Sequence, residues 1–329
     1  MNQAGRSGPS ATDGLADVRI IVEAVHGSRA YGLATAESDA DTKGIFVPPP
    51  EWLQGFRPSP DQLQESPERV LLEVRKFFRL AVESNPTVLE ILFTEPSDRL
   101  TVTTEGQLLI DRRSSFLSRR AGESFGGYGL SQLRRIKTHR RWLLSPPTGK
   151  PERKRFGLPE RTLIPKDQLG AAETMLRDGR IDEAELTPNF LEIMDRERHY
   201  RTALREWQQY QEWLKNRNPK RALLERQFGY DTKHAMHLIR LLKMGVEVLT
   251  TGELTVRRPD REELLAIRRG ELAFDQLMEE AERLGERLKL ATAASVLPDH
   301  PDEEALDRLC IEIVQGARRA SPWGDRGAR

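Results

Sequence analysis

Residues 25–41 read VHGSRAYGLATAESDAD, and this stretch decides the fold because it joins two apolar runs that each predict a strand. The first run, residues 18–25, is rich in β-branched side chains, and the strand that it predicts ends at Gly27. The second extends from about residue 40 to 47 and stops at three prolines. A short helix is expected over residues 29–34. The stretch therefore predicts a strand, a Gly-Ser turn, a short helix and a second strand in succession.

Two aspartates, Asp39 and Asp41, stand where the second strand begins. Side chains two positions apart on a strand point to the same side of the sheet. Carboxylates held side by side repel one another, so a protein that keeps them together generally places a cation between them. Taken alone, such a pair is more often a turn or a solvated cap. The pair is therefore a candidate for binding a divalent metal.

Two further features, together with the aspartates, indicate a site for metal and phosphate more specifically than the aspartates do alone. Gly27 lets the backbone approach a phosphate, and the Ser28 hydroxyl can donate a hydrogen bond to the same group. Glu73 stands between apolar residues in a third predicted strand, residues 70–74, where a lone carboxylate needs a partner. If that strand lies beside the aspartates, Glu73 becomes a third metal ligand, although Glu68 competes for the role.

The composition is that of an ordinary soluble protein. The chain has 329 residues, 31% of them charged, and a formal net charge of +1. No apolar run reaches the roughly 20 residues that span a bilayer, and residues 1–14 lack the apolar core of a secretory signal. Cys310 is the only cysteine, which excludes intrachain disulfides and thiolate-rich zinc sites. We expect a cytoplasmic protein with no membrane partner.

The sequence predicts an α+β protein with two domains between two disordered tails, residues 1–16 and 320–329. Residues 17–104 combine the three strands with a helix over about 75–83. Residues 105–319 show helical spacing in almost every apolar segment, apart from a lone strand at residues 253–256 and a basic loop at 145–168. The predicted helical segments are 107–118, 129–144, 190–215, 231–249, 261–268, 273–290 and 301–319.

The order of these motifs resembles the polymerase-β superfamily of nucleotidyltransferases, in which Gly-Ser is followed by D-x-D and then by a later acid. The wording GSRAYGLATAESDADTKG at residues 27–44 is similar to one branch, the predicted nucleotidyltransferases of RNA repair pathways. A second block, FGYDTKHAMHLIRLL at residues 228–242, is also similar, as are residues 252–254 and 267–271. The resemblance covers roughly residues 18–290.

This resemblance implies a small catalytic domain with a mixed sheet, followed by a larger helical domain. It also implies Mg²⁺ or Mn²⁺ as the cofactor. The implied substrate is a nucleoside triphosphate such as ATP, from which a nucleoside monophosphate is transferred. No protein partner is implied. The residues carried over are Asp39, Asp41 and Glu73 for catalysis and metal binding, and Gly27, Ser28 and Arg29 for nucleotide binding.

Three basic side chains lie along one arc of the helix predicted in the second block. At about 100° per residue, Lys233, His237 and Arg240 fall close together, opposite an apolar seam. Such a stripe suits the phosphates of a nucleotide or an acceptor, and the resemblance favours nucleotide binding here. A solvated basic face is the alternative. His234 lies toward the apolar side, which favours a hydrogen-bonded core histidine.

Ten lysines and arginines oppose two glutamates between Arg134 and Arg161. In a chain of near-neutral total charge, this concentration is typical of a surface that contacts phosphates. A solvated face with no ligand and a loop that closes over the nucleotide are the alternatives. The candidate RNA contacts are Arg134, Arg135, Lys137, Arg140 and Arg141 on a predicted helix, and Arg153, Lys154 and Arg155 in the loop.

Together these features predict a nucleotidyltransferase whose favoured acceptor is an RNA end, such as that of a tRNA under repair. One alternative keeps the chemistry and transfers the nucleotide, for instance AMP, to a hydroxyl of a protein or a small molecule. Another alternative is a non-catalytic module that binds RNA or nucleotide. The presence of all three acidic positions argues against this last reading.

Overall fold

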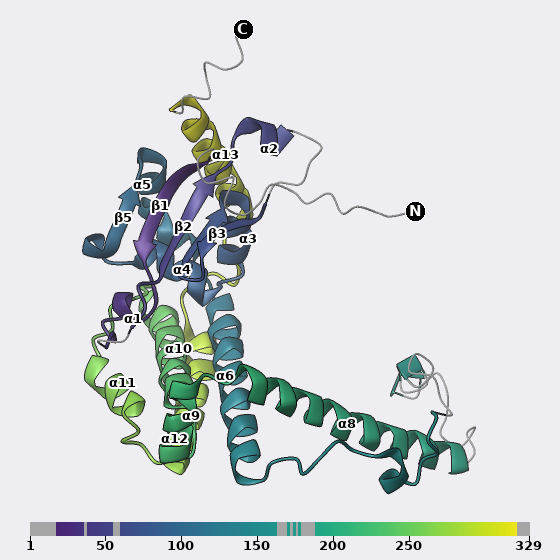
Figure 1. Cartoon of the computed structure of the whole chain (residues 1–329). Helices are drawn as coiled ribbons and strands as arrows, with labels where there is room; N and C mark the ends of the chain where they lie inside the picture. Colours follow the sequence, from purple (N-terminus) through teal and green to yellow (C-terminus); the bar gives the residue numbers. More distant parts are fainter. Residues whose placement is uncertain are drawn as a thin grey trace. The chain divides into compact units, whose positions relative to one another are not determined.

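The computed structural model describes residues 18–35, 38–54, 60–162, 170–171, 174–175, 177–178 and 188–320. The fold is α+β, with a mixed five-stranded sheet near the amino terminus followed by a larger helical region (Figure 1). The predicted fold class is therefore confirmed. The expected tails lie outside the described residues, apart from Ala320, and so do residues 163–168 of the basic loop.

By its contacts the chain divides into two compact units. The first contains the described residues of 1–136 and 232–329, and the second contains those within 137–231. Along the chain, the second unit is thus an insertion in the first. This division differs from the boundary near residue 104 suggested by the sequence, because the last helix of the chain packs on helices near the sheet.

The sheet has the strand order β3–β4–β2–β1–β5. β2 and β4 run parallel, whereas the other neighbouring pairs are antiparallel. In the parallel pair, Thr42 lies opposite Arg69 and Phe46 lies opposite Glu73, so the amino ends of β2 and β4 are side by side. The strands are β1 (Arg19–Val25), β2 (Thr42–Val47), β3 (Gln62–Ser66), β4 (Arg69–Glu73) and β5 (Arg99–Val102).

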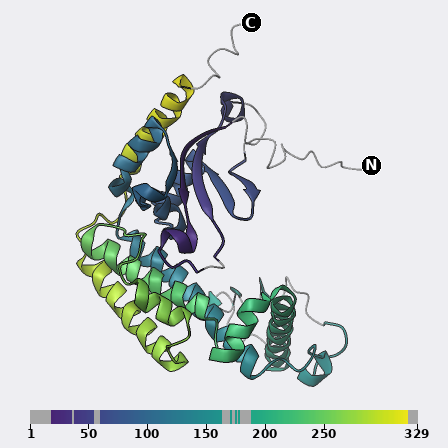
Figure 2. The same ribbon diagram turned by 60° about the vertical axis from the view of Figure 1, so that its left-hand side comes forward.

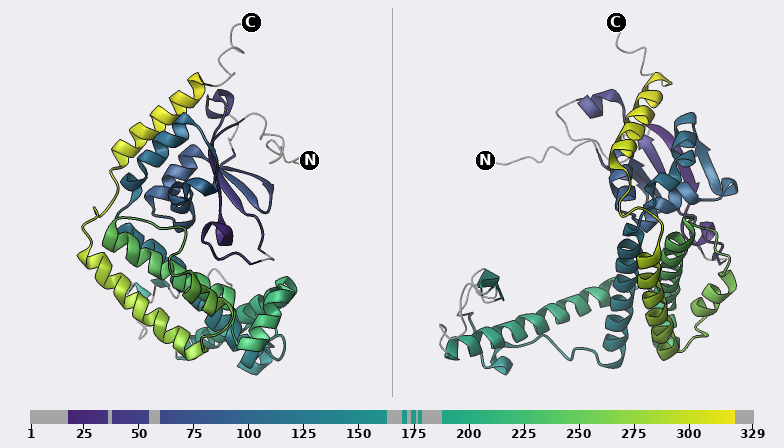
Figure 3. Two further views of the ribbon diagram at one scale, coloured as in Figure 1. Left: turned by 90° about the vertical axis from the view of Figure 1, so that its left-hand side faces the viewer. Right: turned by 180° about the vertical axis from the view of Figure 1, so that it is seen from behind.

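Four helices lie on one side of the sheet (Figure 3), namely α3 (Val74–Val82), α4 (Pro86–Phe93), α5 (Thr104–Asp111) and α13 (Glu303–Arg319). Helix α13 comes from the end of the chain and packs on α3 and α5. Helix α4 is apolar and buried along almost its whole length, and its one acid, Glu90, is buried as well. Two short 3₁₀ turns, Pro96–Asp98 and Arg113–Phe116, connect these elements.

Apart from α9, which was not predicted, the remaining long helices follow the predicted segments with shifted ends. In the first unit, α10 packs against α11 and α12, and Figure 2 shows α10 and α12 side by side. Helix α6 begins in the first unit and continues into the second, which also contains α8, α9 and the 3₁₀ turn η3 (Arg153–Phe156). The helices are α6 (Arg120–Leu144), α8 (Pro188–Asn216), α9 (Pro219–Phe228), α10 (Thr232–Thr251), α11 (Arg261–Arg268) and α12 (Phe274–Ala294).

Two predictions about strands are wrong. Residues 253–256 are not a strand, because the backbone N–H of Thr255 donates to Oε1 of Glu247 at 2.6 Å instead of to a strand partner. The region expected to be irregular, residues 52–67, contains the end of α2 (Pro50–Gln54) and the edge strand β3. Leu63 is the one buried apolar residue of β3, and the polar residues around it leave too little apolar alternation to predict a strand.

Helix α6 begins nine residues earlier than predicted, at Arg120 instead of Gly129. The glycines that obscured its first turns serve close packing against α12. A Cβ added at Gly122 would lie 2.2 Å from Oγ1 of Thr292, and one at Gly126 would lie 3.0 Å from Leu288. Glycine, which weakens a helix in isolation, here permits two helices to approach one another.

Candidate active site

The Gly-Ser turn and the second aspartate meet in the structure. Gly27 begins α1 (Gly27–Ala30) with a φ of +69°, a conformation that L side chains rarely adopt. A Cβ at this position would lie 2.6 Å from Oδ2 of Asp41. The Asp41 carboxylate therefore lies directly against the backbone of Gly27, and only glycine leaves room for it.

Hydrogen bonds hold the aspartates next to this turn. The carbonyl of Asp41 accepts from the backbone N–H of His26 at 2.8 Å, which extends the β1–β2 ladder by one bond. Arg29 donates from Nε to the carbonyl of Asp39 at 3.2 Å and from Nη2 to the carbonyl of Ser38 at 3.1 Å. Asp39 is exposed and Asp41 half-buried. The Arg29 guanidinium thus organises the aspartate loop, and its contact with nucleotide stays a prediction.

The strand register separates Glu73 from the aspartates. Glu73 ends β4 opposite Phe46, four residue pairs beyond Thr42, a separation of about 13 Å along the strand. Its buried carboxylate caps α3 by accepting from the backbone N–H of Lys76 at 3.1 Å. It also accepts from Nε of Arg75 at 2.9 Å. This cap and ion pair account for a lone acid in an apolar strand without a metal.

Glu68, the competing candidate, lies at the level of the aspartates. Its carbonyl accepts from the backbone N–H of Thr42 at 2.8 Å, immediately beside Asp41 in the chain. Paired residues of parallel strands point to the same side of a sheet. Of the two candidates for a third carboxylate, it is therefore the backbone of Glu68, and not that of Glu73, that lies next to Asp41.

The oxygen donors at this end of the sheet fit Mg²⁺. Within the described ranges, no group of three or more histidine, cysteine, aspartate or glutamate side chains is placed to hold a metal. Mg²⁺, however, commonly keeps several waters and takes only one or two protein carboxylates together with substrate phosphates. Asp41, against the backbone of Gly27, is one candidate carboxylate, and the exposed Asp39 two residues before it is the candidate for a second.

A buried carboxylate, Glu90, lies behind the turn and joins three elements. Its Oε2 accepts from the Tyr31 hydroxyl, at the end of α1, at 2.6 Å. Its Oε1 accepts from Nη1 of Arg240 on α10, also at 2.6 Å. The guanidinium carbon of Arg240 lies 3.7 Å from the centroid of the Tyr31 ring, and its Nη2 lies 3.1 Å from Nδ1 of His237. The network ties α4 and α10 to the end of the Gly-Ser turn.

Burial and this network set the charges of the groups behind the turn. Burial alone would raise the pKa of the Glu90 carboxyl, but the charge of Arg240 and its hydrogen bond hold that pKa below its usual range. Burial lowers the pKa of His26 to about 4 and that of His237 to about 3. Both imidazoles are therefore neutral at neutral pH, and the buried charges are those of one ion pair.

The predicted basic stripe on α10 divides into an exposed part and a buried part. Lys233 is exposed and His237 half-buried, whereas Arg240 is 1% exposed and paired with Glu90. Arg240 therefore belongs to the interior. The helical spacing had instead predicted that it contacts a phosphate. His234 is half-buried, in line with its expected place toward the apolar side. Nucleotide contacts of Lys233 and His237 stay predictions.

Three residues beside the turn were not predicted from the sequence: Tyr31, Lys43 and Glu90. Glu90 is a lone acid in the apolar segment PTVLEILF, which is the same signal that drew attention to Glu73. Lys43 lies on β2, two residues after Asp41, whose charge acts on it. It is half-buried, and burial lowers the pKa of its ammonium group. Its cationic group is thus held close to Asp41 and Glu90.

The predicted RNA contacts of α6 are distributed over the two units. Arg134 and Arg135 are exposed on the part of α6 that belongs to the first unit, and Lys137 is exposed in the second. Arg140 donates from Nη1 to the carbonyl of Gly229 at 2.9 Å. Arg141 pairs with Glu206 at 2.6 Å. Arg140 and Arg141 therefore have structural contacts, and RNA contact of the whole set stays a prediction.

The basic loop contains one internal arginine and two exposed cations. Arg153 forms an ion pair with Glu197, which is fully buried on α8. Lys154 and Arg155 are exposed. Arg153 is thus engaged in a buried ion pair, whereas the side chains of Lys154 and Arg155 are exposed to solvent. The sequence of three neighbouring cations does not reveal this difference.

A mixed sheet with a glycine turn packed against the second of two aspartates is the arrangement expected of a polymerase-β-like nucleotidyltransferase domain. Residues 10–144 match the family RlaP, described as the RNA repair pathway DNA polymerase beta family. The resemblance drawn from the motifs is thereby confirmed over this segment. The second block, residues 228–242, lies outside the match.

Two curated proteins are similar to part of the chain. One is the uncharacterized protein YcgL of Bacillus subtilis (strain 168), 34% identical over 103 residues, which are 30% of this chain and 40% of that protein. The other is an uncharacterized 38.9 kDa protein from the nrdC-mobD intergenic region of Enterobacteria phage T4. It is 30% identical over 90 residues, which are 24% of this chain and 27% of that protein.

The match thus spans less than half the length of either relative. No solved structure matches this chain. Among the residues that the structure describes, no helix has both the length and the apolar character needed to cross a membrane.

Proposed function

We propose that the protein is a Mg²⁺-dependent nucleotidyltransferase that transfers a nucleoside monophosphate from a nucleoside triphosphate to the hydroxyl of an RNA end, such as that of a tRNA under repair. The contact between Gly27 and Asp41 carries the proposal, since it joins the phosphate-binding turn to the metal-binding aspartates. The family match over residues 10–144 supports the setting in RNA repair.

Asp39 and Asp41 would hold the metal, and Glu68 would take the role first given to Glu73. A bound Mg²⁺, or Mn²⁺ in its place, would neutralise phosphate charge and favour ionisation of the attacking hydroxyl. Glu68 is exposed at the amino end of β4, beside Asp41, where an acceptor can reach it. Glu73 instead supports the fold through its cap on α3.

In the reaction, the acceptor oxygen forms a bond to the α-phosphorus of the triphosphate. The bond from that phosphorus to the oxygen bridging to the β-phosphate breaks, and pyrophosphate leaves with the electron pair. The hydroxyl proton passes to the carboxylate of Glu68. The protein's contribution is chiefly to position the reactants and to stabilise the developing charge, as in other phosphoryl-group transfers.

The groups that hold the β- and γ-phosphates surround the turn. Gly27 and Ser28 offer backbone N–H groups and a hydroxyl, and Lys43 offers a half-buried cation close to Asp41. Lys233 and His237 would approach from α10. Arg240 acts indirectly, because its stacking on Tyr31 and its ion pair with Glu90 fix the end of α1.

The test uses the purified full chain with each labelled nucleoside triphosphate, Mg²⁺ and separate RNA, protein and small-molecule fractions. Asp41→Asn should lower incorporation of label by at least about a hundredfold while the circular dichroism spectrum stays unchanged. Incorporation by this variant at the wild-type rate would overturn the mechanism.

Two matched variants test the choice of the third carboxylate. Glu68→Gln should lower kcat and leave the melting temperature unchanged. Glu73→Gln should lower stability by about 1 kcal/mol through the weakened helix cap and retain incorporation. The opposite pattern would return the role to Glu73.

The same assay separates the competing acceptors. Label that appears in a protein or a small molecule, and not in RNA, would replace the RNA end by the corresponding hydroxyl. Binding of nucleotide without turnover on any acceptor would favour a non-catalytic binding module.

A further inference from the structure

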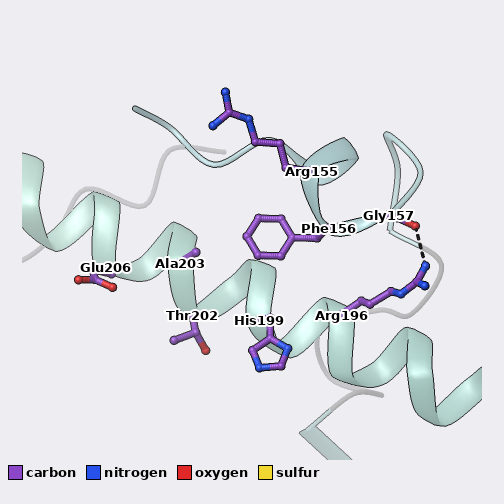
Figure 4. Close-up of a pocket in the computed structure, with 8 residues that line it drawn as sticks. All are labelled: Arg155, Phe156, Gly157, Arg196, His199, Thr202, Ala203 and Glu206. Carbon is purple, nitrogen blue, oxygen red and sulfur yellow. Dashed lines mark hydrogen bonds between the residues drawn. The ribbon is translucent and has the colours of Figure 1, made fainter. Parts of the chain in front are cut away.

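The second unit contains a hollow of about 540 Å³ between η3 and α8 (Figure 4). Arg155 and Phe156 line it from η3, and Arg196, His199 and Thr202 line it from α8. In Figure 4 the ring of Phe156 lies over α8, amid the other lining residues. The hollow thus combines an aromatic ring with cationic and hydroxyl groups.

Buried contacts hold this side of the hollow in place. Glu197, fully buried on α8, pairs with Arg153 and accepts from the Thr162 hydroxyl at 3.1 Å. Arg196 donates from Nη1 to the carbonyl of Gly157 at 3.3 Å, and Gly157 has a φ of +66°. The segment that presents Phe156 is therefore anchored on both sides of the ring.

The ring itself is positioned and only half-buried. Phe156 packs edge to face on Tyr200, with centroids 5.6 Å apart and an interplanar angle of 72°. The Tyr200 ring is in turn covered by the guanidinium of Arg153, whose carbon lies 5.1 Å from the ring centroid. A rigid, partly exposed aromatic ring is a surface on which an unstacked base can lie.

Arg155 differs from the other cations around the hollow. It is exposed, and its guanidinium forms no ion pair or hydrogen bond with any residue that the structure describes. Arg196 is partly neutralised by Glu192 at 2.6 Å, and His199 lies 3.2 Å from Asp195. Glu206, the acid that lines the hollow, is paired with Arg141. The uncompensated charge at the hollow is therefore that of Arg155.

We infer that this hollow binds an unpaired nucleotide of a single-stranded RNA, with its base against Phe156 and a neighbouring phosphate on Arg155. The inference rests on the proposed function in naming RNA, the proposed acceptor, as the ligand. It goes beyond that function by assigning a second contact, in the inserted unit, at a defined pair of residues. Arg153, a candidate contact by sequence, has instead a structural role through Glu197.

The test is direct binding of the full chain to a fluorescently labelled single-stranded RNA, without nucleotide or metal. Phe156→Leu keeps apolar bulk and removes the stacking surface, so the Kd should rise about tenfold. Arg155→Ala should also weaken binding and should reduce the slope of log K against log salt by about one. Arg226→Ala, an exposed arginine of α9 outside the hollow, is the control and should leave the Kd within twofold.

Wild-type affinity in both hollow variants would overturn the inference, as would an equal loss in the Arg226→Ala control. Photocrosslinking of RNA that contains 4-thiouridine should label the peptide around residues 153–157. Crosslinks confined to other segments would also overturn it. If a duplex or an acidic protein bound more tightly than single-stranded RNA, single-stranded RNA would be the wrong ligand for the hollow.

Failure of this inference is distinguishable from failure of the proposed function. Asp41→Asn should bind RNA as the wild type does, although it incorporates no nucleotide. RNA binding at the hollow by a chain that never transfers nucleotide would leave the inference standing and remove the proposed function. Nucleotide transfer by the Phe156→Leu and Arg155→Ala variants, with an unchanged Kd for RNA, would leave the proposed function standing and remove the inference about the hollow.

Discussion

Gly27 shows how one residue without a side chain can shape the candidate site, because its backbone leaves room for the Asp41 carboxylate. Gly27→Ala should cost about 1–2 kcal/mol of stability through its positive φ, and it should also displace the Asp41 carboxylate that lies 2.6 Å from the new Cβ. We therefore expect incorporation of nucleotide to be lost even where the protein is folded. The measurements are the free energy of unfolding and the rate of incorporation.

Gly32 provides the matched control. Its φ is +71°, but the nearest atom to an added Cβ is 3.8 Å away, on the side chain of Arg257. Gly32→Ala should therefore show the backbone cost without the displacement of a carboxylate. Equal losses of activity in the two variants would mean that strain, and not the place of Asp41, explains the effect.

Individual residues of the candidate site differ in how far the sequence alone could predict their place. The Gly27–Asp41 contact was foreseeable, because the turn and the aspartates are close in the chain and their residue types fit one chemistry. The choice between Glu68 and Glu73 was not, because both are acids near one strand and only the β2–β4 register separates them. Register depends on pairing across the sheet, which a single strand does not encode.

Among the elements, α4 and α10 are joined by a buried ion pair behind the turn. Glu90→Gln removes the charge that compensates Arg240 and should destabilise the first unit by about 3–5 kcal/mol. Chemical denaturation measures this loss. Glu83→Gln, which breaks an exposed ion pair with Arg120, should cost at most about 1 kcal/mol. Equal costs at the two positions would contradict the role of the buried pair.

Helix α10 also predicts a dependence of stability on pH. The pKa of His237 is lowered to about 3 by burial and by Arg240, whereas an unfolded histidine titrates near 6.5. The unfolded state therefore binds the proton first as pH falls, so stability is complete above about 6.5 and declines toward pH 3.

This decline has a maximal slope of about 1.4 kcal/mol per pH unit for one histidine. His237→Asn, which keeps an acceptor for Arg240, should flatten the stability curve by up to that amount. Urea denaturation of both proteins across this range provides the measurement. Parallel curves for the two proteins would show that His237 does not titrate differently on unfolding.

Helices and strands were predicted correctly where the periodicity of apolar residues was strong. They were missed where contact with another segment of the chain determines the structure. The spacing of apolar residues found most of α8, α10, α12 and α13. It missed β3, whose exposed residues alternate weakly, and the start of α6, where glycines meet α12. The start of α6 is stabilised by the distant α12. β3 is stabilised by pairing with the neighbouring β4, and its own residues show too little apolar alternation to signal that pairing.

At the scale of the molecule, the two units divide the proposed work between nucleotide chemistry and RNA binding. Glu197→Gln breaks the buried pair with Arg153 and should destabilise the second unit by about 3–5 kcal/mol. We expect weaker RNA binding and unchanged affinity for nucleoside triphosphate. Calorimetric unfolding and two separate binding titrations measure these effects.

Glu212→Gln, an exposed change on the same helix, should alter neither affinity. If Glu197→Gln weakened nucleotide binding to the same extent as RNA binding, the two units would not act separately. Retention of full RNA affinity by a destabilised Glu197→Gln protein would remove the hollow from RNA recognition.

The ion pair between Glu90 and Arg240 has a consequence for how the protein is made. The two residues are 150 positions apart in the chain, and the whole inserted unit is synthesised between them. At 5–20 residues per second, roughly 8–30 s pass on the ribosome before the arginine follows the glutamate. Until α10 emerges, Glu90 has no Arg240 with which to pair. The motif that is translated almost first is among the last parts of its unit to reach its final form.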